Sequence, residues 1–381
     1  MTFKQSAHPL LLIPGSIEVA DNVLEANGSP SMSHTHQPFI GIFQSALQNL
    51  RKLFKSTDHK AQAFVISGSG TLGWDIVASN LIKPKEDALV LSTGFFSDRF
   101  ADALTTYGVN TDVIRADLGD YVSYEEIEKA LGRKKYKIIT ITHVDTSTAV
   151  LSNVEEISKI VKKVSPETLI VVDGVCSVAV EDIEFDKWGI DYVLTASQKA
   201  IGVPPGLSIS FISGRALDVA LNRDVDTTYF ASLKRWDIIM KAYESGKGAY
   251  FATPSVQLIN ALKVSLENIL CKPLDERFKL HIENSDWFKG ELEKLGLKLV
   301  SKKHAGCHAL TAAYFPEGVT GANLFPLTSK RNVVFAGGVH KDIATKYFRV
   351  GHMGVSVVDR DDTKVALEAI KESLLELSVK S

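Results

Sequence analysis

The chain has 381 residues, of which 45% are hydrophobic and 23% charged, as in ordinary globular proteins. Its formal net charge of −2, without a basic stripe or a charged tail, argues against nucleic acid and anionic membranes as partners. Its apolar runs fall short of the roughly 20 residues that a membrane-spanning helix needs.

The predicted elements alternate between strands and helices over the first part of the chain. Residues 1–60 are interpreted as an arm and a polar loop that lead into an amphipathic helix near 38–55. Hydrophobic runs then predict strands at 63–67, 88–92, 109–114, 137–142, 169–173, 192–194 and 207–212, and helices at 72–81, 98–107, 124–131 and 154–164. Strands separated by helices imply an α/β fold with parallel pairing and right-handed crossovers.

The pattern changes after about residue 230. It predicts longer helices at 233–245, 255–270 and 274–295, short strands near 297–300, 308–315, 332–335 and 346–350, and a closing helix at 363–377. We therefore expect an N-terminal arm over residues 1–15, a large domain over 16–270 and a smaller α+β domain over 271–381.

The cysteines and histidines give no sign of a metal site. Cys176, Cys271 and Cys307 are far apart and form no CxxC pair, which argues against a disulfide framework and against structural zinc. His34 and His36 lie in a polar loop without further ligands at metal-binding spacing, so we expect no metal.

The chain ends bear on location. The N-terminus has neither the apolar core of a secretory signal nor the arginines of a transit peptide, and the last residues, 378–381, come close to a peroxisomal Ser-Lys-Leu tail without matching it. We expect a cytoplasmic protein, with a peroxisomal or mitochondrial location left open.

A glycine-rich loop, Gly68-Ser69-Gly70-Thr71-Leu72-Gly73, joins a predicted strand to a predicted helix and matches GxGxxG. A dinucleotide-binding loop would place an acidic residue roughly 20 positions later, at the end of the next strand. Because that strand ends in Thr93 and Gly94, an NAD(P)-dependent oxidoreductase is the weaker interpretation. The same residues suit a single phosphate at a helix N-terminus, and a simple helix cap is the remaining alternative.

Lys199 and Asp173 each follow a buried strand. Asp173 closes the run 169–173, and Lys199 lies between the run 192–194 and a turn rich in glycine and proline at 200–206. Ligands bind at the carboxyl edge of such sheets, where both residues are expected. Pyridoxal phosphate needs an amine for its aldehyde and a carboxylate for its pyridinium nitrogen, so the pair favours this cofactor. The alternatives are an exposed lysine and a turn aspartate.

Seven sets of short segments, ordered along nearly the whole chain, carry a family resemblance. They are Leu12–Gly15, Ser67–Thr71, Thr142–Thr148, Asp173–Val175, Ser197–Ala200 with Pro204–Gly206, Tyr250–Pro254 and Arg349–Gly351. Together they resemble the alanine–glyoxylate and serine–pyruvate aminotransferases, class V enzymes of fold type I that use pyridoxal phosphate. The resemblance implies a large domain with a mostly parallel sheet and a smaller C-terminal α+β domain.

The resemblance gives each matched residue a role. It implies that Lys199 is the Schiff-base lysine and that Asp173 pairs with the pyridinium nitrogen. The other implied cofactor contacts are Ser69, Gly70 and Thr71 at the phosphate and cofactor edge, Gln198 at the phosphate, Phe96 over the ring, and Thr146 and Val175 beside it. Many relatives have tryptophan at the position of Phe96, so the residue differs while the stacking role is retained.

The resemblance also implies a homodimer with shared active sites. Tyr250 and Thr253 would reach the phosphate held by the partner subunit, Arg349 would bind the substrate carboxylate, and Gly15 would line the substrate pocket. No second arginine stands out as a partner for a side-chain carboxylate, which favours small neutral donors. We expect ping-pong transamination from L-alanine, or from L-serine, to glyoxylate or pyruvate. With alanine and glyoxylate it would give pyruvate and glycine, for glycine biosynthesis or glyoxylate detoxification.

Two departures from the family pattern concern the substrate pocket. Ser16 follows Gly15 where the family often has proline, and Ala149 stands where glycine often occurs. Another reaction of the same cofactor, by a lyase or a cysteine desulfurase, stays open. A desulfurase needs a reactive cysteine on a flexible loop, whereas Cys307 leads directly into an apolar strand. The sequence does not decide between alanine and serine.

Overall fold

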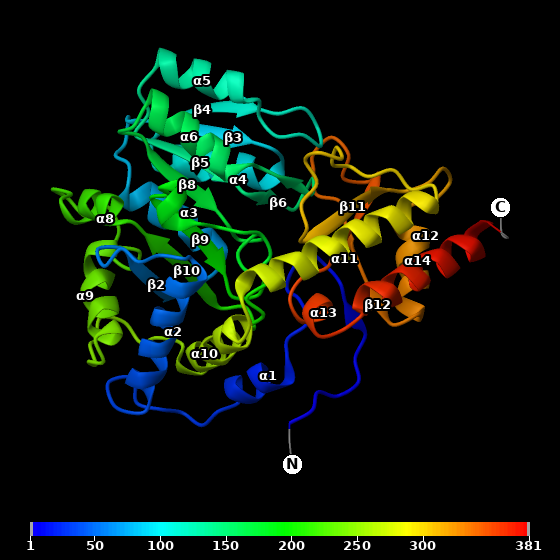
Figure 1. Cartoon of the computed structure of the whole chain (residues 1–381), viewed down its shortest axis with the longest axis horizontal. Helices are drawn as coiled ribbons and strands as arrows, with labels where there is room; N and C mark the ends of the chain where they lie inside the picture. The colour runs from blue at the N-terminus through cyan, green and yellow to red at the C-terminus, as the bar shows by residue number, and fades with distance from the viewer. Residues whose placement is uncertain (1–2, 379–381) are drawn as a thin grey trace.

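The computed structural model describes residues 3–378 and is built around a seven-stranded sheet (Figure 1). In order across the sheet, the strands are β2 (Gln62–Ser67), β10 (Leu207–Ile212), β9 (Tyr192–Ala196), β8 (Leu169–Asp173), β5 (Ile138–Thr142), β3 (Asp87–Ser92) and β4 (Asn110–Arg115). Only β10 is antiparallel to its neighbours in this sheet, which confirms the mostly parallel sheet expected from the sequence. The central strands are buried along their whole length, as strands covered by helices must be.

The turn between β9 and β10 explains why these two strands are antiparallel. No helix lies between them, so the chain reverses at the sheet edge instead of crossing over. The turn is compact, because the Val203 amide donates to the Ser197 carbonyl at 2.9 Å and Ser197 Oγ donates to the Pro204 carbonyl at 2.9 Å. Lys199 is therefore held at the carboxyl edge of the parallel strands.

Helices pack against the sheet and connect its strands. They are α2 (Phe39–Leu53), α3 (Gly70–Asn80), α4 (Phe95–Thr106), α5 (Tyr124–Arg133), α6 (Val154–Val164), α8 (Gly214–Leu221), α9 (Leu233–Glu244) and α10 (Val256–Leu270), with a short α7 (Phe185–Trp188). Helix α3 packs on β9 and β10. A Cβ on Gly73 would lie 2.9 Å from Leu194 Cβ, so this glycine allows the helix to approach the sheet closely.

The C-terminal elements gather on one side of the sheet, and the long helix α11 (Leu274–Lys294) runs toward them (Figure 1). Their antiparallel sheet has the order β11 (Leu310–Tyr314), β14 (Tyr347–Gly351), β13 (Ala336–Gly337). The helices of this part are α12 (Gly321–Lys330), α13 (Val355–Val358) and α14 (Asp362–Ser378). A second hydrophobic cluster, including Phe288, Phe348 and Ile370, forms its core. These features agree with a smaller C-terminal α+β domain.

The N-terminal segment joins both parts of the molecule. Strand β1 (Leu10–Leu11) pairs in parallel with β12 (Val333–Val334), and the Gly351 amide donates to the Leu12 carbonyl at 2.8 Å. A few residues later the Ile17 amide donates to the Gln198 carbonyl at 3.2 Å, in the turn that carries Lys199. Residues 12–17 therefore pass from the C-terminal sheet to the edge of the large sheet.

Several predicted elements differ from the structure. The strand predicted near 297–300 is wrong, because only Leu299 pairs, in a single bridge with Ala313. Helices α1 (Asp21–Asn27), α7, α8, α12 and α13 were not predicted, nor was the hairpin of β6 (Val144–Asp145) and β7 (Val150–Leu151). Of the tail weighed as an organelle signal, residues 379–381 lie outside the described range. Over residues 3–378, no helix is both long and apolar enough to cross a membrane.

Candidate active site

A cavity of about 160 Å³ lies where the parallel strands end. Nine of the residues that line it were predicted from the sequence: Ser69, Gly70, Thr71, Phe96, Thr146, Asp173, Val175, Gln198 and Lys199. Four further lining residues were not assigned from the sequence: Trp74, Thr142, Val144 and Cys176. The fold therefore brings together residues from five separate segments of the chain.

Asp173 is the last residue of β8, and its side chain is almost completely buried. Trp74 Nε1 donates to its Oδ2 at 2.8 Å, and the Val175 amide donates to its Oδ1 at 3.0 Å. Burial raises the pKa of Asp173 to about 6, although these two hydrogen bonds and the positive charge of Lys199 oppose the shift. A carboxylate held in this way is suited to bind a buried cation or a protonated ring nitrogen.

Lys199 lies in the same cavity, and its Nζ donates to the Pro14 carbonyl at 2.8 Å. The next residue, Gly15, leaves the space that the lysine fills. A Cβ on Gly15 would lie 2.4 Å from Lys199 Cδ and 2.5 Å from Nζ, and the φ of +123° also disfavours any other residue. The structure thus places Gly15 against Lys199, next to the cavity.

Helix α3 begins at the cavity with the glycine-rich loop. Ser69 is its N-cap residue, but the Ser69 side chain makes no capping bond, so a simple cap does not explain it. A Cβ on Gly70 would lie 3.0 Å from Val175 Cγ2, which shows how closely this loop approaches the end of β8. The N-terminus of a helix attracts anions, since its amides point outward and its dipole is positive there.

Arg349 lies on β14, only 8% exposed, and does not line the cavity itself. Its Nε donates to the Gly337 carbonyl at 2.8 Å, and one terminal nitrogen donates to the Thr146 carbonyl at 3.2 Å. Because Thr146 does line the cavity, the guanidinium is held immediately behind the cavity wall. Burial lowers the pKa of Arg349 from its usual value.

Two predicted residues are not brought to this cavity. Tyr250 is 64% exposed and lies beside His34, with ring centroids 5.2 Å apart and the rings tilted. Thr253 is also exposed. Neither residue lines the cavity of its own chain.

Comparison with known proteins identifies the family. Residues 17–350 match the sequence profile of the family described as aminotransferase class V. The chain belongs to the class V aminotransferases. It is 50% identical to alanine–glyoxylate aminotransferase 1 of Saccharomyces cerevisiae, over 92% of this chain and 93% of the yeast protein.

Solved structures agree with this assignment of the family. An aspartate aminotransferase of subgroup IV from Thermus thermophilus is 30% identical and superposes with a TM-score of 0.86, over 96% of this chain and 99% of that one. An alanine–glyoxylate aminotransferase from Nostoc is 26% identical, with a TM-score of 0.88 over 97% and 96% of the two chains. The chain is therefore a fold-type I transaminase that uses pyridoxal phosphate, as the sequence resemblance implied.

The cavity fits this cofactor chemically. It combines an amine on Lys199, a buried carboxylate on Asp173 and the N-terminus of α3, which correspond to the aldehyde, ring nitrogen and phosphate of the cofactor. The Oε1 of the Gln198 carboxamide is buried without a partner among the described residues, so this side chain has an acceptor that no protein group occupies.

The structure weakens the alternatives. Gly73 in the GxGxxG match is explained by helix packing against β9, and the family is not one of nicotinamide-dependent enzymes. Cys307 is fully buried, and burial raises the pKa of its thiol to about 12, which is unsuited to the nucleophile of a desulfurase.

Proposed function

We propose that this chain transfers the amino group of L-alanine to glyoxylate, giving pyruvate and glycine, with L-serine as a second donor and pyruvate as a second acceptor. The observation that carries the proposal is that Lys199 and Asp173 share one small cavity, with Arg349 bonded to its wall. The name of the yeast relative, at 50% identity, supports the choice of alanine and glyoxylate. Roles in glycine biosynthesis and glyoxylate detoxification follow from these products.

Lys199 is proposed as the residue that moves the proton. When bound, pyridoxal phosphate supplies an aldehyde that takes up the amino group and a ring that withdraws electrons from the substrate. Lys199 carries the only amine among the residues that line the cavity, so its Nζ removes the proton from the α-carbon of the donor and later returns a proton. The hydrogen bond to the Pro14 carbonyl keeps this nitrogen beside the cavity.

Asp173 and the start of α3 are proposed to bind and orient the cofactor. The two donors to the Asp173 carboxylate fix its plane, so that it can keep the ring nitrogen protonated. Ser69, Gly70, Thr71 and Gln198 hold the phosphate, Phe96 covers one ring face, and Thr146 and Val175 contact the ring edge.

The size and charge of the site favour a small neutral donor. Arg349 binds the α-carboxylate, for which a planar guanidinium is better suited than an ammonium group. Arg349 is bonded to the cavity wall through Thr146, and Lys199 is the only cation among the described residues that line the cavity, so a second carboxylate has no obvious partner there. Gly15, next to Lys199, borders the space for the donor side chain.

We further propose that the enzyme acts as a homodimer with shared sites. Exposed Tyr250 and Thr253 would reach the phosphate site of the partner subunit. We also propose that the chain is divided into an arm over residues 1–15, a large domain over 16–270 and a small domain over 271–381. A cytoplasmic location is proposed as well.

A donor and acceptor panel tests the proposed reaction. Purified enzyme with pyridoxal phosphate should convert alanine and glyoxylate, and turnover should stop without a keto acid. Ready use of aspartate without activity on alanine would overturn the proposal that alanine is the donor. Turnover of an amino acid without a keto acid would indicate a lyase.

The site itself is tested by borohydride reduction and peptide mapping, which should place the phosphopyridoxyl group on Lys199. Lys162→Ala, on α6, is the matched control because it removes a lysine outside the cavity and should leave this labelling intact. Loss of the label in Lys162→Ala, or labelling of a lysine other than Lys199, would contradict the assignment.

A further inference from the structure

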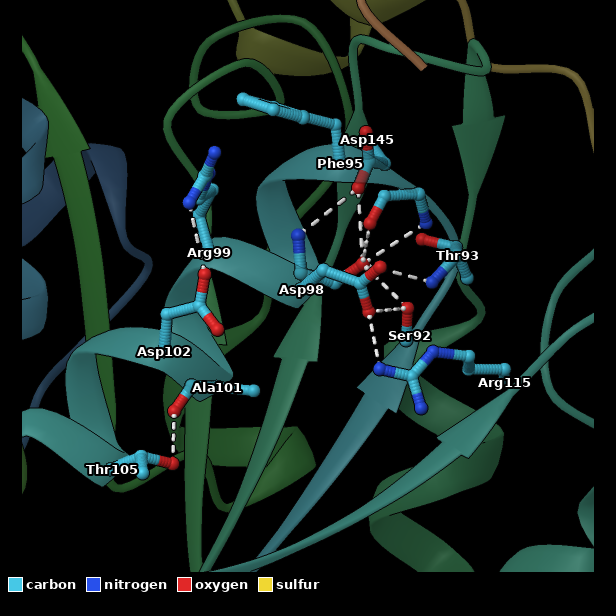
Figure 2. Close-up of polar contacts among 12 residues, drawn as sticks. Ser92, Thr93, Phe95, Asp98, Arg99, Ala101, Asp102, Thr105, Arg115 and Asp145 are labelled. Carbon is cyan, nitrogen blue, oxygen red and sulfur yellow. Dashed lines mark hydrogen bonds and ion pairs between the residues drawn. The ribbon is translucent and has the colours of Figure 1, made fainter. Parts of the chain in front are cut away.

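Asp145 is a fully buried carboxylate that does not line the cavity, yet it lies behind two residues that do. It ends strand β6, and Thr146 follows it directly. Across from it is the first turn of α4, which carries Phe96. Figure 2 shows Asp145 beside the start of this helix, together with Asp98, a carboxylate that belongs to the first turn of α4 itself.

The Asp145 carboxylate accepts four hydrogen bonds, two from each side. Its Oδ1 accepts from the amide of Ser147 at 3.0 Å and from Ser147 Oγ at 2.6 Å. Its Oδ2 accepts from the amide of Ser97 at 3.2 Å and from Ser97 Oγ at 3.1 Å. A negative charge is favourable at this place because it faces the N-terminus of α4.

These bonds fix the two cavity-lining residues relative to each other. Phe96 lies between Phe95 and Ser97, and the Phe95 amide donates to Ser147 Oγ at 2.8 Å. Thr146 lies between Asp145 and Ser147. Both neighbours of Phe96 and both neighbours of Thr146 thus belong to one hydrogen-bonded unit.

The close approach of the two segments requires glycine at position 94. A Cβ on Gly94 would lie 2.2 Å from Ser147 Oγ and 2.8 Å from Asp145 Oδ1. The sequence therefore leaves space for this carboxylate next to the start of α4.

The same loop also holds the residue proposed to bind substrate. The Thr146 carbonyl accepts from Arg349 at 3.2 Å, and the Ser147 carbonyl accepts from the Tyr347 hydroxyl at 2.5 Å. Both donors lie on β14 of the C-terminal sheet. The loop next to Asp145 is thus one contact through which β14 is aligned with the cavity.

We propose that Asp145 is a positioning residue, which sets Phe96, Thr146 and Arg349 in one geometry for cofactor and amino acid. This inference rests on the proposed function for the role of Arg349, but its effect on cofactor binding is independent of which donor is used. Replacing the carboxylate by an amide places an NH₂ group against the donors of Ser97 or Ser147. Because an NH₂ group cannot accept hydrogen bonds, the bonds on that side are lost.

The test compares Asp145→Asn with Asp98→Asn. Asp98 lies in the first turn of α4. Its carboxylate accepts from Ser92 Oγ at 2.8 Å and pairs with Arg115 at 3.1 Å, and neither of these partners belongs to the Thr146 loop. The readouts are the Kd of the apoprotein for pyridoxal phosphate, the visible circular dichroism of the bound cofactor, the KM for alanine and the Tm.

We expect Asp145→Asn to raise both the Kd for the cofactor and the KM for alanine about tenfold or more, since it breaks hydrogen bonds to a charged group. The circular dichroism of the cofactor should weaken as well. Asp98→Asn should leave Kd and KM within about twofold, because its contacts do not reach the cavity. Ser147→Ala should change Kd and KM in the same direction as Asp145→Asn, and it serves as the test if Asp145→Asn does not fold.

The proposal would be overturned if Asp145→Asn had the Kd and KM of the wild type. It would also be overturned if Asp145→Asn and Asp98→Asn raised the Kd and KM equally. Should the wild-type enzyme fail to use alanine, the proposed donor falls, while the comparison of cofactor Kd between the two variants still decides the role of Asp145.

Discussion

Trp74 Nε1 donates a hydrogen bond of 2.8 Å to Oδ2 of Asp173. The bond joins α3, which begins at the proposed phosphate site, to the end of β8. It also opposes the effect of burial, because a donor to the carboxylate lowers the pKa of Asp173 while burial raises it. Trp74 therefore helps to keep Asp173 ionised in a site that disfavours charge.

Trp74→Phe should weaken cofactor binding without removing any residue that would contact the substrate carboxylate. Loss of a hydrogen bond to a charged group costs about 1.5–3 kcal/mol, so the Kd for pyridoxal phosphate should rise about 10- to 100-fold. Cofactor titration of the apoprotein measures this. Trp188→Phe is the matched control, since Trp188 Nε1 is buried without a partner among the described residues. Equal Kd values for the two variants would contradict the role of Trp74.

Gly15→Ala should reduce turnover more than it reduces stability. The added Cβ would collide with Lys199 and displace the nitrogen proposed to move the proton. Gly318→Ala introduces backbone strain at a φ of +75°, but its added Cβ meets no atom within 4 Å. It therefore shows the effect of backbone strain without a collision and serves as the control. We expect Gly318→Ala to lose about 1 kcal/mol of stability with normal kcat, and Gly15→Ala to lose kcat at least about tenfold. Equal kcat in both variants would refute the explanation.

Asp173→Asn should change how the stability of the apoprotein depends on pH. The pKa of Asp173 is about 6 in the folded chain and near 3.9 when unfolded. As pH rises between these values, the unfolded chain loses a proton that the folded chain keeps, so the free energy of unfolding falls. This loss is complete above about pH 6 and absent near pH 3.

The free energy of unfolding of Asp173→Asn, measured relative to wild type, should therefore rise by about 2–3 kcal/mol between pH 4 and pH 7, although this variant loses the cofactor. Chemical denaturation of the two apoproteins at several pH values gives this difference. If the free energies of unfolding of the two apoproteins changed equally with pH, Asp173 would not titrate in this range.

Mixed dimers test whether the sites are shared. Lys199→Ala and the double variant Tyr250→Phe with Thr253→Val should each have little activity. After mixing and exchange of subunits, half of the sites in each mixed dimer are complete, so activity should recover to roughly a quarter of wild type. A mixture of Lys199→Ala with itself is the control. No recovery, with subunit exchange verified by mass, would place Tyr250 and Thr253 outside the partner's site.

Much of the fold could be predicted because its strands are short, fully buried runs between amphipathic helices. Asp173 and Lys199 could be predicted for the same reason, since Asp173 ends such a run and Lys199 closely follows another. Helix α12 was missed because Pro326 lies inside it, and proline is normally read as a helix end.

The positioning residues could not be predicted, because their function depends on contacts between distant segments. Trp74 lies 99 residues from Asp173 and looks like an ordinary core residue of a helix. Asp145 was part of a recognised segment, but only the structure shows its bonds to Ser97, 48 residues away. The roles proposed for Tyr250 and Thr253 require a second chain, which a single sequence does not place.

The pairing of β1 with β12 has a consequence for how the protein is made. Pro14 contacts Lys199, yet the segment before it is held by Val333, Val334 and Gly351. A nascent chain on the ribosome has made Pro14 and Lys199 long before these last partners emerge. The wall of the cavity around Lys199 is therefore completed only after residue 351 has been made, so a chain that stops before this residue would lack the finished binding site.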